Sequence, residues 1–316
     1  MAATAVTTVA TVVTGIEAAG PGIKYFTLED PDGWELPPAR PGAHIDVNLP
    51  GGLVRTYSLC NGPQIETRYE IAVKHEATGR GGSTVLCNKV AVGDKLGVSL
   101  PRGGIPLPAE TRHILIAGGI GVTPFLSVAS ALLHRGESDF MLHLAARGEM
   151  PLARLLAPLQ ARELVKVYDT TGGRPDLSAM IGRPVPGIQL SCSGPPAMLD
   201  AFEAATRHWP PDQLHIERFV APPLVLDPDA RPYTLVLARS AKTLEVPAGQ
   251  SMLSAIAECG VQVPTSCGGG ICGACRVRLL EGNPLHHDRF LSPAEREHNL
   301  LACVAGCAGG RLVLDL

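Results

Sequence analysis

The first third of the chain contains short runs in which apolar and polar residues alternate, separated by residues typical of turns. Alternation with a period of two predicts β-strands that bury one face. The runs are Val6–Ile16 and residues 23–28, 43–49, 54–60, 68–73 and 95–100. This succession predicts a small antiparallel β-barrel over residues 1–108.

The middle third has a different pattern, in which apolar strands are followed by longer, helix-like segments. The strand-like runs 113–121, 140–147 and 188–194 precede the helix-like segments 122–136, 151–164 and 195–209. Strands that alternate with helices predict an α/β domain with a parallel sheet over residues 109–222.

Residues 223–232 are rich in Pro and polar residues, which indicates a linker. The rest of the chain, residues 233–316, mixes strands with a helix. Strand-like runs lie at 233–239, 242–247 and 311–316, and a short helical segment lies at 251–259. We therefore expect a multidomain protein whose last domain is of the α+β class.

Composition and charge narrow the classes of function. The formal net charge of -3 over 316 residues provides no basic field for phosphate backbones, so nucleic acid is not an expected partner. No Lys or Arg precedes Lys24, and the apolar N-terminal stretch is interrupted by Thr, unlike a secretory signal. No uncharged apolar run is long enough to span a membrane. We expect a cytoplasmic monomer.

Three of the nine cysteines are grouped with a specific spacing. Cys267, Cys272 and Cys275 are separated by four and then two residues, and Cys303 is available as a distant fourth thiolate. This is the plant-type spacing for a 2Fe-2S cluster. The glycines inside the loop let the backbone turn sharply and bring its N–H groups close to sulfur. Zinc sites usually have two short pairs of ligands, so we favour the cluster.

Two cysteines are candidates for the fourth cluster ligand. Cys307 lies only four residues beyond Cys303, but Cys303 directly follows an apolar run that could deliver it from an ordered segment. We therefore favour Cys303. The remaining cysteines, Cys60, Cys87, Cys192 and Cys259, are interpreted as buried thiols.

Two further motifs suggest phosphate-containing cofactors. Residues 79–84, GRGGST, form a glycine-rich turn that enters a helix, where N–H groups can bind a phosphate. Residues 113–127, HILIAGGIGVTPFLS, read as a strand, a glycine turn and the start of a helix, which suits a dinucleotide. Residues 55–59, RTYSL, lie on a predicted barrel strand and could be either a flavin site or an ordinary edge strand.

With these motifs the whole chain resembles the phthalate dioxygenase reductase family, including vanillate demethylase reductase-like proteins. Residues 231–316 resemble a plant-type ferredoxin, which implies a β-grasp fold. The order of the modules, with the ferredoxin last, implies FMN rather than FAD. The resemblance further implies NADH as the electron donor.

The resemblance assigns the flavin site to the barrel. Arg55 would pair with the flavin phosphate, Tyr57 would lie against the ring, and Ser58 would bond near its reactive nitrogen. The remaining flavin contacts are Ala72, Val73, Lys74, Gly81, Gly82, Ser83 and Phe219. For Lys74 and the adjacent His75 a solvated strand end, and for Phe219 a buried core position, are alternatives to a flavin contact.

The nicotinamide site would be formed by the family's GGIGxTP motif and a second segment. The first comprises Gly118, Gly119, Gly121, Thr123 and Pro124. The second is Cys-Gly-Pro in the family, but here the aligned residues are Ser193, Gly194 and Pro195, preceded by Cys192. Either Ser193 replaces the thiol, or Cys192 is only a core residue. Ser58, Tyr57 and Thr123 are the expected catalytic contacts.

The three modules together imply an electron-transfer enzyme. NADH gives up two electrons at once and the cluster takes one at a time, so a flavin is needed between them. The implied acceptor is the Rieske centre of a terminal oxygenase acting on aromatic compounds. A di-iron, haem or quinone acceptor and a redox sensor without turnover are the alternatives. Arg147, at the end of a predicted strand, could favour NADPH against the family's NADH.

Overall fold

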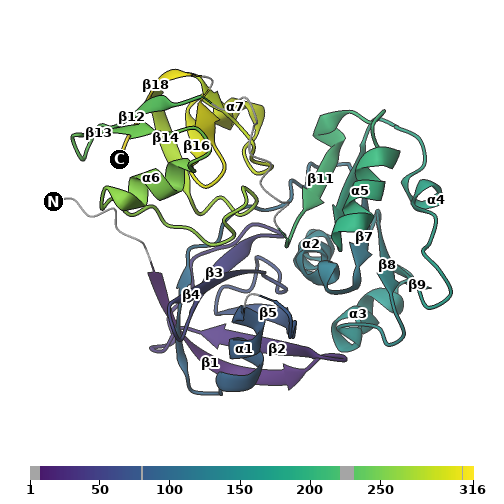
Figure 1. Ribbon diagram of the computed structural model, residues 1–316. Coiled ribbons are helices and arrows are strands. Elements are labelled where there is room, and N and C mark those ends of the chain that lie inside the picture. The colour runs from purple at the N-terminus through teal and green to yellow at the C-terminus, as the bar shows by residue number, and fades with distance from the viewer. Residues whose placement is uncertain (1–7, 80, 221–230, 308) are drawn as a thin grey trace. The chain divides into compact units, whose positions relative to one another are not determined.

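The structure is a computed structural model that describes residues 8–79, 81–220, 231–307 and 309–316 (Figure 1). The chain divides into two compact units, one ending at Phe219 and the other beginning at Val220. The first unit contains both the predicted antiparallel sheet and the predicted parallel sheet. A domain boundary between them near residue 108 stays a prediction. Most of the predicted linker lies outside the described residues.

The antiparallel sheet has six strands in the order β4-β3-β6-β1-β2-β5. They are β1 (Thr8–Ala18), β2 (Ile23–Glu29), β3 (His44–Leu49), β4 (Leu53–Ser58), β5 (Arg68–Lys74) and β6 (Lys95–Ser99). A single bridge between Leu59 and Ile71 joins the two edges of the sheet, so the barrel is nearly closed. The predicted strand Val6–Ile16 is found as β1, although Val6 and Thr7 lie outside the described residues.

The barrel encloses its own apolar core. Phe26, Ile45, Ile71 and Leu86 are fully buried inside it. Leu86 comes from helix α1 (Gly82–Lys89), which packs on the barrel and whose first residues belong to the GRGGST motif. Burial of apolar surface stabilises the folded state by roughly 25 cal/mol per Å². The burial of Leu86 therefore holds α1 against the barrel.

The parallel sheet has five strands in the order β11-β10-β7-β8-β9, as predicted for an α/β domain. They are β7 (Arg112–Gly118), β8 (Phe140–Ala146), β9 (Val165–Asp169), β10 (Ile188–Ser193) and β11 (Leu214–Glu217). The α-helices are α2 (Thr123–His134), α3 (Ala153–Gln160), α4 (Leu177–Ile181) and α5 (Pro196–Ala205), and the 3-10 helices are η1 (Gly119–Val122) and η2 (Pro211–Gln213). Strands β9 and β11 and helix α4 were not predicted.

Parallel strands end at the same edge of a sheet, and this edge collects the predicted nucleotide residues. Strand β7 ends at Gly118 and its neighbour β10 ends at Ser193, with Ala117 opposite Ser193 in the register. Ligands of open α/β sheets bind outside the carboxyl ends of the strands. The two predicted nicotinamide segments therefore start side by side.

The second unit is a mixed sheet with a helix on it, in the order β13-β12-β18-β14-β16. Its strands are β12 (Tyr233–Leu237), β13 (Lys242–Val246), β14 (Arg276–Glu281), β16 (Asn299–Leu301) and β18 (Gly310–Leu314), with a separate pair of β15 (Pro284–Leu285) and β17 (Gly306–Cys307). Strands β12 and β18 run parallel, and their neighbours run antiparallel. The expected β-grasp arrangement is confirmed.

The helices of the second unit begin at side-chain caps. Helix α6 (Met252–Glu258) begins at Ser251, whose hydroxyl accepts from the N–H of Ser254, and Met252 and Ile256 bury it in the core. Helix α7 (Pro293–Arg296) begins at a capping box of Ser292 and Glu295.

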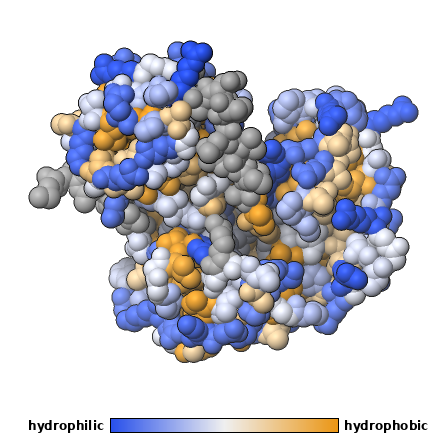
Figure 2. Space-filling view, viewed as in Figure 1, coloured by the Kyte–Doolittle hydropathy of each residue, from blue (hydrophilic) through white to orange (hydrophobic). Residues whose placement is uncertain are grey.

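The visible surface of the molecule mixes hydrophilic residues with smaller apolar areas (Figure 2). In the described part of the chain no helix is long and apolar enough to cross a membrane.

Candidate cofactor sites

The RTYSL residues form the edge strand β4, which pairs with β3 so that Val47 faces Arg55 and His44 faces Ser58. Alternate residues of a strand share a face, which puts Arg55 and Tyr57 together. Burial raises the pKa of Tyr57 to about 12, while nearby Arg55 lowers it. Tyr57 is therefore a neutral ring at physiological pH, as an aromatic contact to a flavin would require.

The residues of the predicted phosphate site lie where α1 begins. Gly81 has a φ of 82°, in the left-handed region that favours glycine. A β-carbon at Gly82 would lie 2.8 Å from Nε of Arg55, closer than real side chains approach. The Arg55 side chain thus lies against the start of α1. A guanidinium beside helix N–H groups is a suitable site for a phosphate.

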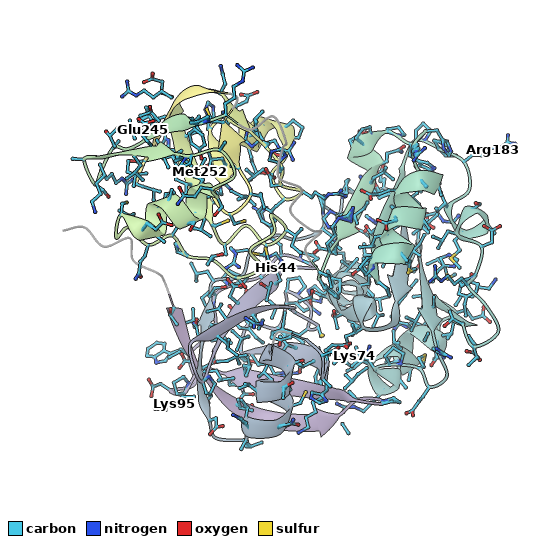
Figure 3. The ribbon with its side chains drawn as sticks, viewed as in Figure 1. His44, Lys74, Lys95, Arg183, Glu245 and Met252 are labelled. Atoms are coloured by element: carbon cyan, nitrogen blue, oxygen red, sulfur yellow. The ribbon has the colours of Figure 1, made fainter. Side chains whose placement is uncertain are left out.

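The other polar residues of this region have protein partners. The hydroxyl of Ser83 accepts a hydrogen bond from the N–H of Glu76 at 3.1 Å. Lys74, labelled in Figure 3, forms an exposed ion pair with Glu76 at 2.8 Å. His75 Nε2 lies 3.4 Å from the hydroxyl of Thr84 on α1. The ammonium of Lys74 is thus at the protein surface, and its predicted flavin contact stays a prediction.

Ala72 and Val73 occupy opposite faces of β5. Val73 is fully buried in the barrel core, whereas Ala72 belongs to a cluster that includes Phe125 and Ala129 of α2. Their side chains are therefore engaged in packing. A flavin contact of these residues would be made through the backbone.

The glycine turn after β7 packs directly on the Ser193–Pro195 segment. A β-carbon at Gly118 would lie 2.6 Å from Sδ of Met198 and 2.7 Å from Cδ of Pro195. One at Gly121 would lie 2.9 Å from Cα of Gly194. Gly119 has a φ of 54°, again in the left-handed region. The structure thus brings the two predicted nicotinamide segments together, and glycine is required by close approach.

Ser193 and Cys192 lie on opposite faces of β10. Ser193 is 0% exposed, and its hydroxyl has no hydrogen-bond partner among the described residues. A buried polar atom without a partner costs free energy unless a ligand completes its bonding. Cys192 instead lies in an apolar cluster with Ile116 and Phe202, and burial raises its pKa to about 12. The structure therefore places Cys192 in the core.

Two predicted nicotinamide residues lie at the start of α2, and the predicted flavin contact Phe219 follows β11. The hydroxyl of Thr123 donates to the carbonyl of Ile120 at 3.1 Å, and Pro124 occupies the first turn of α2. Phe219 follows β11 and is 39% exposed, so it is not a buried core residue. An exposed aromatic ring at this position is available to a ligand.

The four predicted cluster cysteines form two pairs. The thiol of Cys272 hydrogen-bonds to Cys267, and that of Cys275 to Cys303. No group of three or more His, Cys, Asp or Glu residues in the described chain is arranged to hold one metal ion. Two pairs of thiolates are the donor set that a cluster with two irons requires.

The pKa values of these thiols follow from their contacts. The bond from Cys272 and three backbone N–H groups, those of Gly269, Ile271 and Cys272, lower the pKa of Cys267 to about 5. The pKa of Cys303 is lowered by Cys275 and by the N–H of Gly270. The pKa values of the donor thiols of both pairs are raised by the same bonds. Backbone N–H groups that stabilise thiolates also suit a cluster.

Cys307 lies in a different environment from Cys303. It belongs to β17, and its thiol donates to the carbonyl of Gly309 at 3.3 Å. This geometry supports Cys303 as the fourth ligand. Among the other cysteines, Cys60 and Cys87 are buried as expected, but Cys259 at the end of α6 is only half-buried.

The sequence did not predict the residues that pack against the glycines of the cluster loop. A β-carbon at Gly270 would lie 3.0 Å from Cα of Asp288, and one at Gly273 would lie 3.0 Å from Cδ1 of Phe290. Asp288 and Phe290 belong to an irregular segment between β15 and α7. No spacing in the sequence connects them to the cysteines.

Known proteins show the same combination of modules. Residues 235–307 match the 2Fe-2S iron-sulfur cluster binding domain family. Phthalate dioxygenase reductase of Burkholderia cepacia is 38% identical over 300 residues, which cover 92% of each chain. These matches confirm the resemblance predicted from the motifs.

Two solved structures are also similar. One, described as phthalate dioxygenase reductase with a modular structure for electron transfer from pyridine nucleotides to [2Fe-2S], has a TM-score of 0.70 at 35% identity and 98% coverage of both chains. An intact type IV self-sufficient cytochrome P450 monooxygenase has a TM-score of 0.90 at 35% identity. Our chain is covered to 98% in that match but spans only 41% of the P450 chain.

Proposed function

Because the chain belongs to the phthalate dioxygenase reductase family, we propose that it transfers electrons from NADH through FMN and its own 2Fe-2S cluster to an oxygenase component. The observation that supports this proposal is that one chain combines three arrangements: Arg55 against Gly82, the Gly118 turn against Pro195, and two pairs of cysteines. A chain that only bound a cluster would need neither of the first two.

The residues of the first unit bind and orient the two organic cofactors. Arg55 and the N–H groups that begin α1 hold the phosphate of FMN, and Tyr57 provides an aromatic face beside the ring. The hydroxyl of Ser193 and the Gly118–Gly121 turn receive the nicotinamide end of NADH. When bound, FMN supplies a carrier that accepts two electrons and releases them singly.

The second unit holds the cluster. Cys267, Cys272, Cys275 and Cys303, whose thiols lie in two pairs, would supply the four thiolates that hold a 2Fe-2S cluster. The N–H groups around Cys267 and Cys303 stabilise negative charge on the sulfurs. This module delivers single electrons to the partner, whose acceptor is a Rieske centre. The protein acts as a cytoplasmic monomer.

Steady-state assays with two acceptors test the proposal. Ferricyanide accepts electrons from a flavin, whereas cytochrome c serves as a model of a one-electron protein partner. We expect wild-type protein to oxidise NADH with both acceptors. Cys303→Ser should retain the ferricyanide rate and lose most of the cytochrome c rate. A protein with bound flavin that oxidises NADH with neither acceptor would refute the proposal and favour a sensor without turnover.

A haem acceptor is the second candidate. It is supported by the match of nearly the whole chain to part of a self-sufficient P450 monooxygenase. The reductase would then be related to a module that serves haem rather than a Rieske centre. Reconstitution with a Rieske oxygenase and, separately, with a cytochrome P450 distinguishes the two partners, because only the correct acceptor should couple NADH oxidation to substrate turnover.

A carboxylate at the carboxyl edge of the parallel sheet supports NADH, rather than NADPH, as the donor. Arg147 follows β8, but the adjacent β9 ends at Asp169, which faces Ala146 in the register. Hydrogen bonds from Thr171 lower the pKa of the Asp169 carboxyl, so it is ionised at neutral pH. A carboxylate at this edge can accept a hydrogen bond from a ribose hydroxyl and would repel a 2′-phosphate.

A further inference from the structure

One buried carboxylate in the second unit is not explained by the fold or by the cluster ligands. The side chain of Asp288 is 1% exposed and lies in the segment that packs behind the cluster loop. Buried carboxylates are costly unless they are hydrogen-bonded. Both carboxylate oxygens of Asp288 have polar neighbours, and these neighbours show which part of the chain Asp288 positions.

One carboxylate oxygen of Asp288 fixes the turn that follows it. Oδ2 accepts from the N–H of Phe290 at 3.2 Å and from that of Leu291 at 2.9 Å. Side-chain acceptors of this kind impose a turn on the next residues. The other oxygen, Oδ1, lies 3.5 Å from Nδ1 of His286.

Arg296 holds the same segment from helix α7. Its NH2 donates to the backbone carbonyl of Asp288 at 2.6 Å and lies 3.4 Å from Oδ2. Helix α7 is itself fixed by the capping box of Ser292 and Glu295. The turn is therefore anchored at both ends, by its own carboxylate and by a neighbouring guanidinium.

The anchored turn contacts the cluster loop at Gly270. The N–H of Arg289 donates to the carbonyl of Gly270 at 3.0 Å. Gly270 has a φ of 73°, and Asp288 and Val304 leave no room for a side chain there. On its other side, the N–H of Gly270 lowers the pKa of Cys303, and the N–H of the adjacent Gly269 donates to the sulfur of Cys267 at 3.4 Å. The orientation of these loop N–H groups thus depends on the turn that Asp288 holds.

We propose, on the basis of the cluster function proposed above, that Asp288 and Arg296 are positioning residues that aim the N–H groups of Gly269 and Gly270 at the sulfurs of Cys267 and Cys303 and thereby raise the reduction potential of the cluster. Hydrogen bonds to cluster sulfurs are one of the factors that set this potential. They stabilise the more negative, reduced form.

The sign of the shift in midpoint potential distinguishes a residue that positions an N–H group from one that acts only through its charge. Removal of a negative charge near the cluster favours the reduced form and shifts the midpoint potential upward. Loss of an N–H bond to sulfur shifts it downward. Asp288→Ala does both, and we expect the downward shift to prevail. At a fixed potential the ratio of reduced to oxidised cluster should fall about threefold to tenfold, the range expected from one hydrogen bond.

Three further variants complete the test. Asp288→Asn retains an oxygen that can accept from Phe290 and Leu291, so it should restore the wild-type potential or exceed it. Glu297→Gln makes the same change of charge at an exposed position and is the matched control. Arg296→Lys keeps the charge but loses the planar guanidinium, and it should shift the potential down by less than Asp288→Ala.

Spectroelectrochemical titration and EPR of the reduced full-length holoprotein provide the readouts. Asp288→Ala should also change the g-values, which report the surroundings of the sulfurs. An upward shift in Asp288→Ala, whether equal to or larger than that of the exposed Glu297→Gln, would show a charge effect alone and overturn the proposal. If Asp288→Ala does not retain its cluster, an unchanged potential and spectrum in Arg296→Lys would overturn it instead. A wild-type protein without a 2Fe-2S signal would refute the proposed function rather than this inference.

Discussion

Replacement of Gly82 by Ala should displace Arg55 from the start of α1 and weaken FMN binding. A β-carbon at residue 82 would lie 2.8 Å from Arg55 Nε and 3.0 Å from its Cδ. Contacts under about 3 Å are not tolerated by packed side chains, so the guanidinium must move. The backbone at Gly82 is not in the left-handed region, and Ala is compatible with a helix. The effect should therefore be steric and local.

The magnitude follows from the bond that is lost. A hydrogen bond to a charged group contributes about 1.5–3 kcal/mol. A change of about 1.4 kcal/mol corresponds to tenfold in Kd, so we expect FMN to bind Gly82→Ala roughly 10- to 100-fold more weakly. Arg55→Ala should cause a loss of the same order. Because both act on one contact, the double variant should bind FMN about as weakly as Arg55→Ala alone.

Fluorescence titration of the flavin-free protein with FMN measures these affinities. Gly172→Ala is the matched control, because a β-carbon there contacts nothing within 4 Å and the backbone is again not left-handed. Thermal unfolding of both variants separates a binding defect from lost stability. Wild-type affinity in Gly82→Ala, or losses that add in the double variant, would refute the cradle formed by Arg55 and α1.

Three other predictions concern the cluster and the nucleotide. Cys303→Ser should lose the cluster signal in EPR while Cys307→Ser retains it, and the reverse would identify Cys307 as the ligand. Ser193→Ala should lower kcat/KM for NADH about threefold to tenfold, as expected from one hydrogen bond. Cys192→Ala should change it less than twofold, and equal effects would contradict the placement of Cys192 in the core. Steady-state rates should favour NADH, and a kcat/KM for NADPH that is equal or higher would make Arg147 the specificity residue.

The local patterns that identify this protein are contained within short segments. The spacing of Cys267, Cys272 and Cys275 follows from the size of the cluster that one loop can wrap, so it is visible in the sequence. The RTYSL strand and the two glycine turns are likewise contiguous. The period of two predicted the antiparallel sheet and the alternation of strands with helices predicted the parallel one, because burial of one face imposes a period on the residues. The β-grasp sheet was implied only by the resemblance to ferredoxin.

The edge elements of the sheets were harder to predict. Strand β9 (Val165–Asp169) is partly exposed and lacks a strong apolar run, and β15 and β17 are two residues long. Their hydrogen bonds come from neighbours that are distant in sequence. Local propensity does not specify such strands, because tertiary pairing does.

Pairing between distant residues was decided only by the tertiary structure. The sequence could propose Cys303 as the fourth ligand, but the placement of its thiol by Cys275, with Cys307 beside Gly309, depends on the path of the chain between β16 and β18. The contrast between Ser193 and Cys192 also required the sheet, since adjacent residues of a strand face opposite layers.

Thus the sequence by itself determined which chemistries the chain carries, because each cofactor motif is a local arrangement of a few residue types. The tertiary structure decided which side chains reach those motifs: Arg55 against Gly82, Pro195 against Gly118 and Asp288 behind Gly270. Each of these contacts joins segments that are remote in the chain. These segments come within van der Waals distance only through the packing of the folded chain, so no spacing in the sequence predicts the contacts.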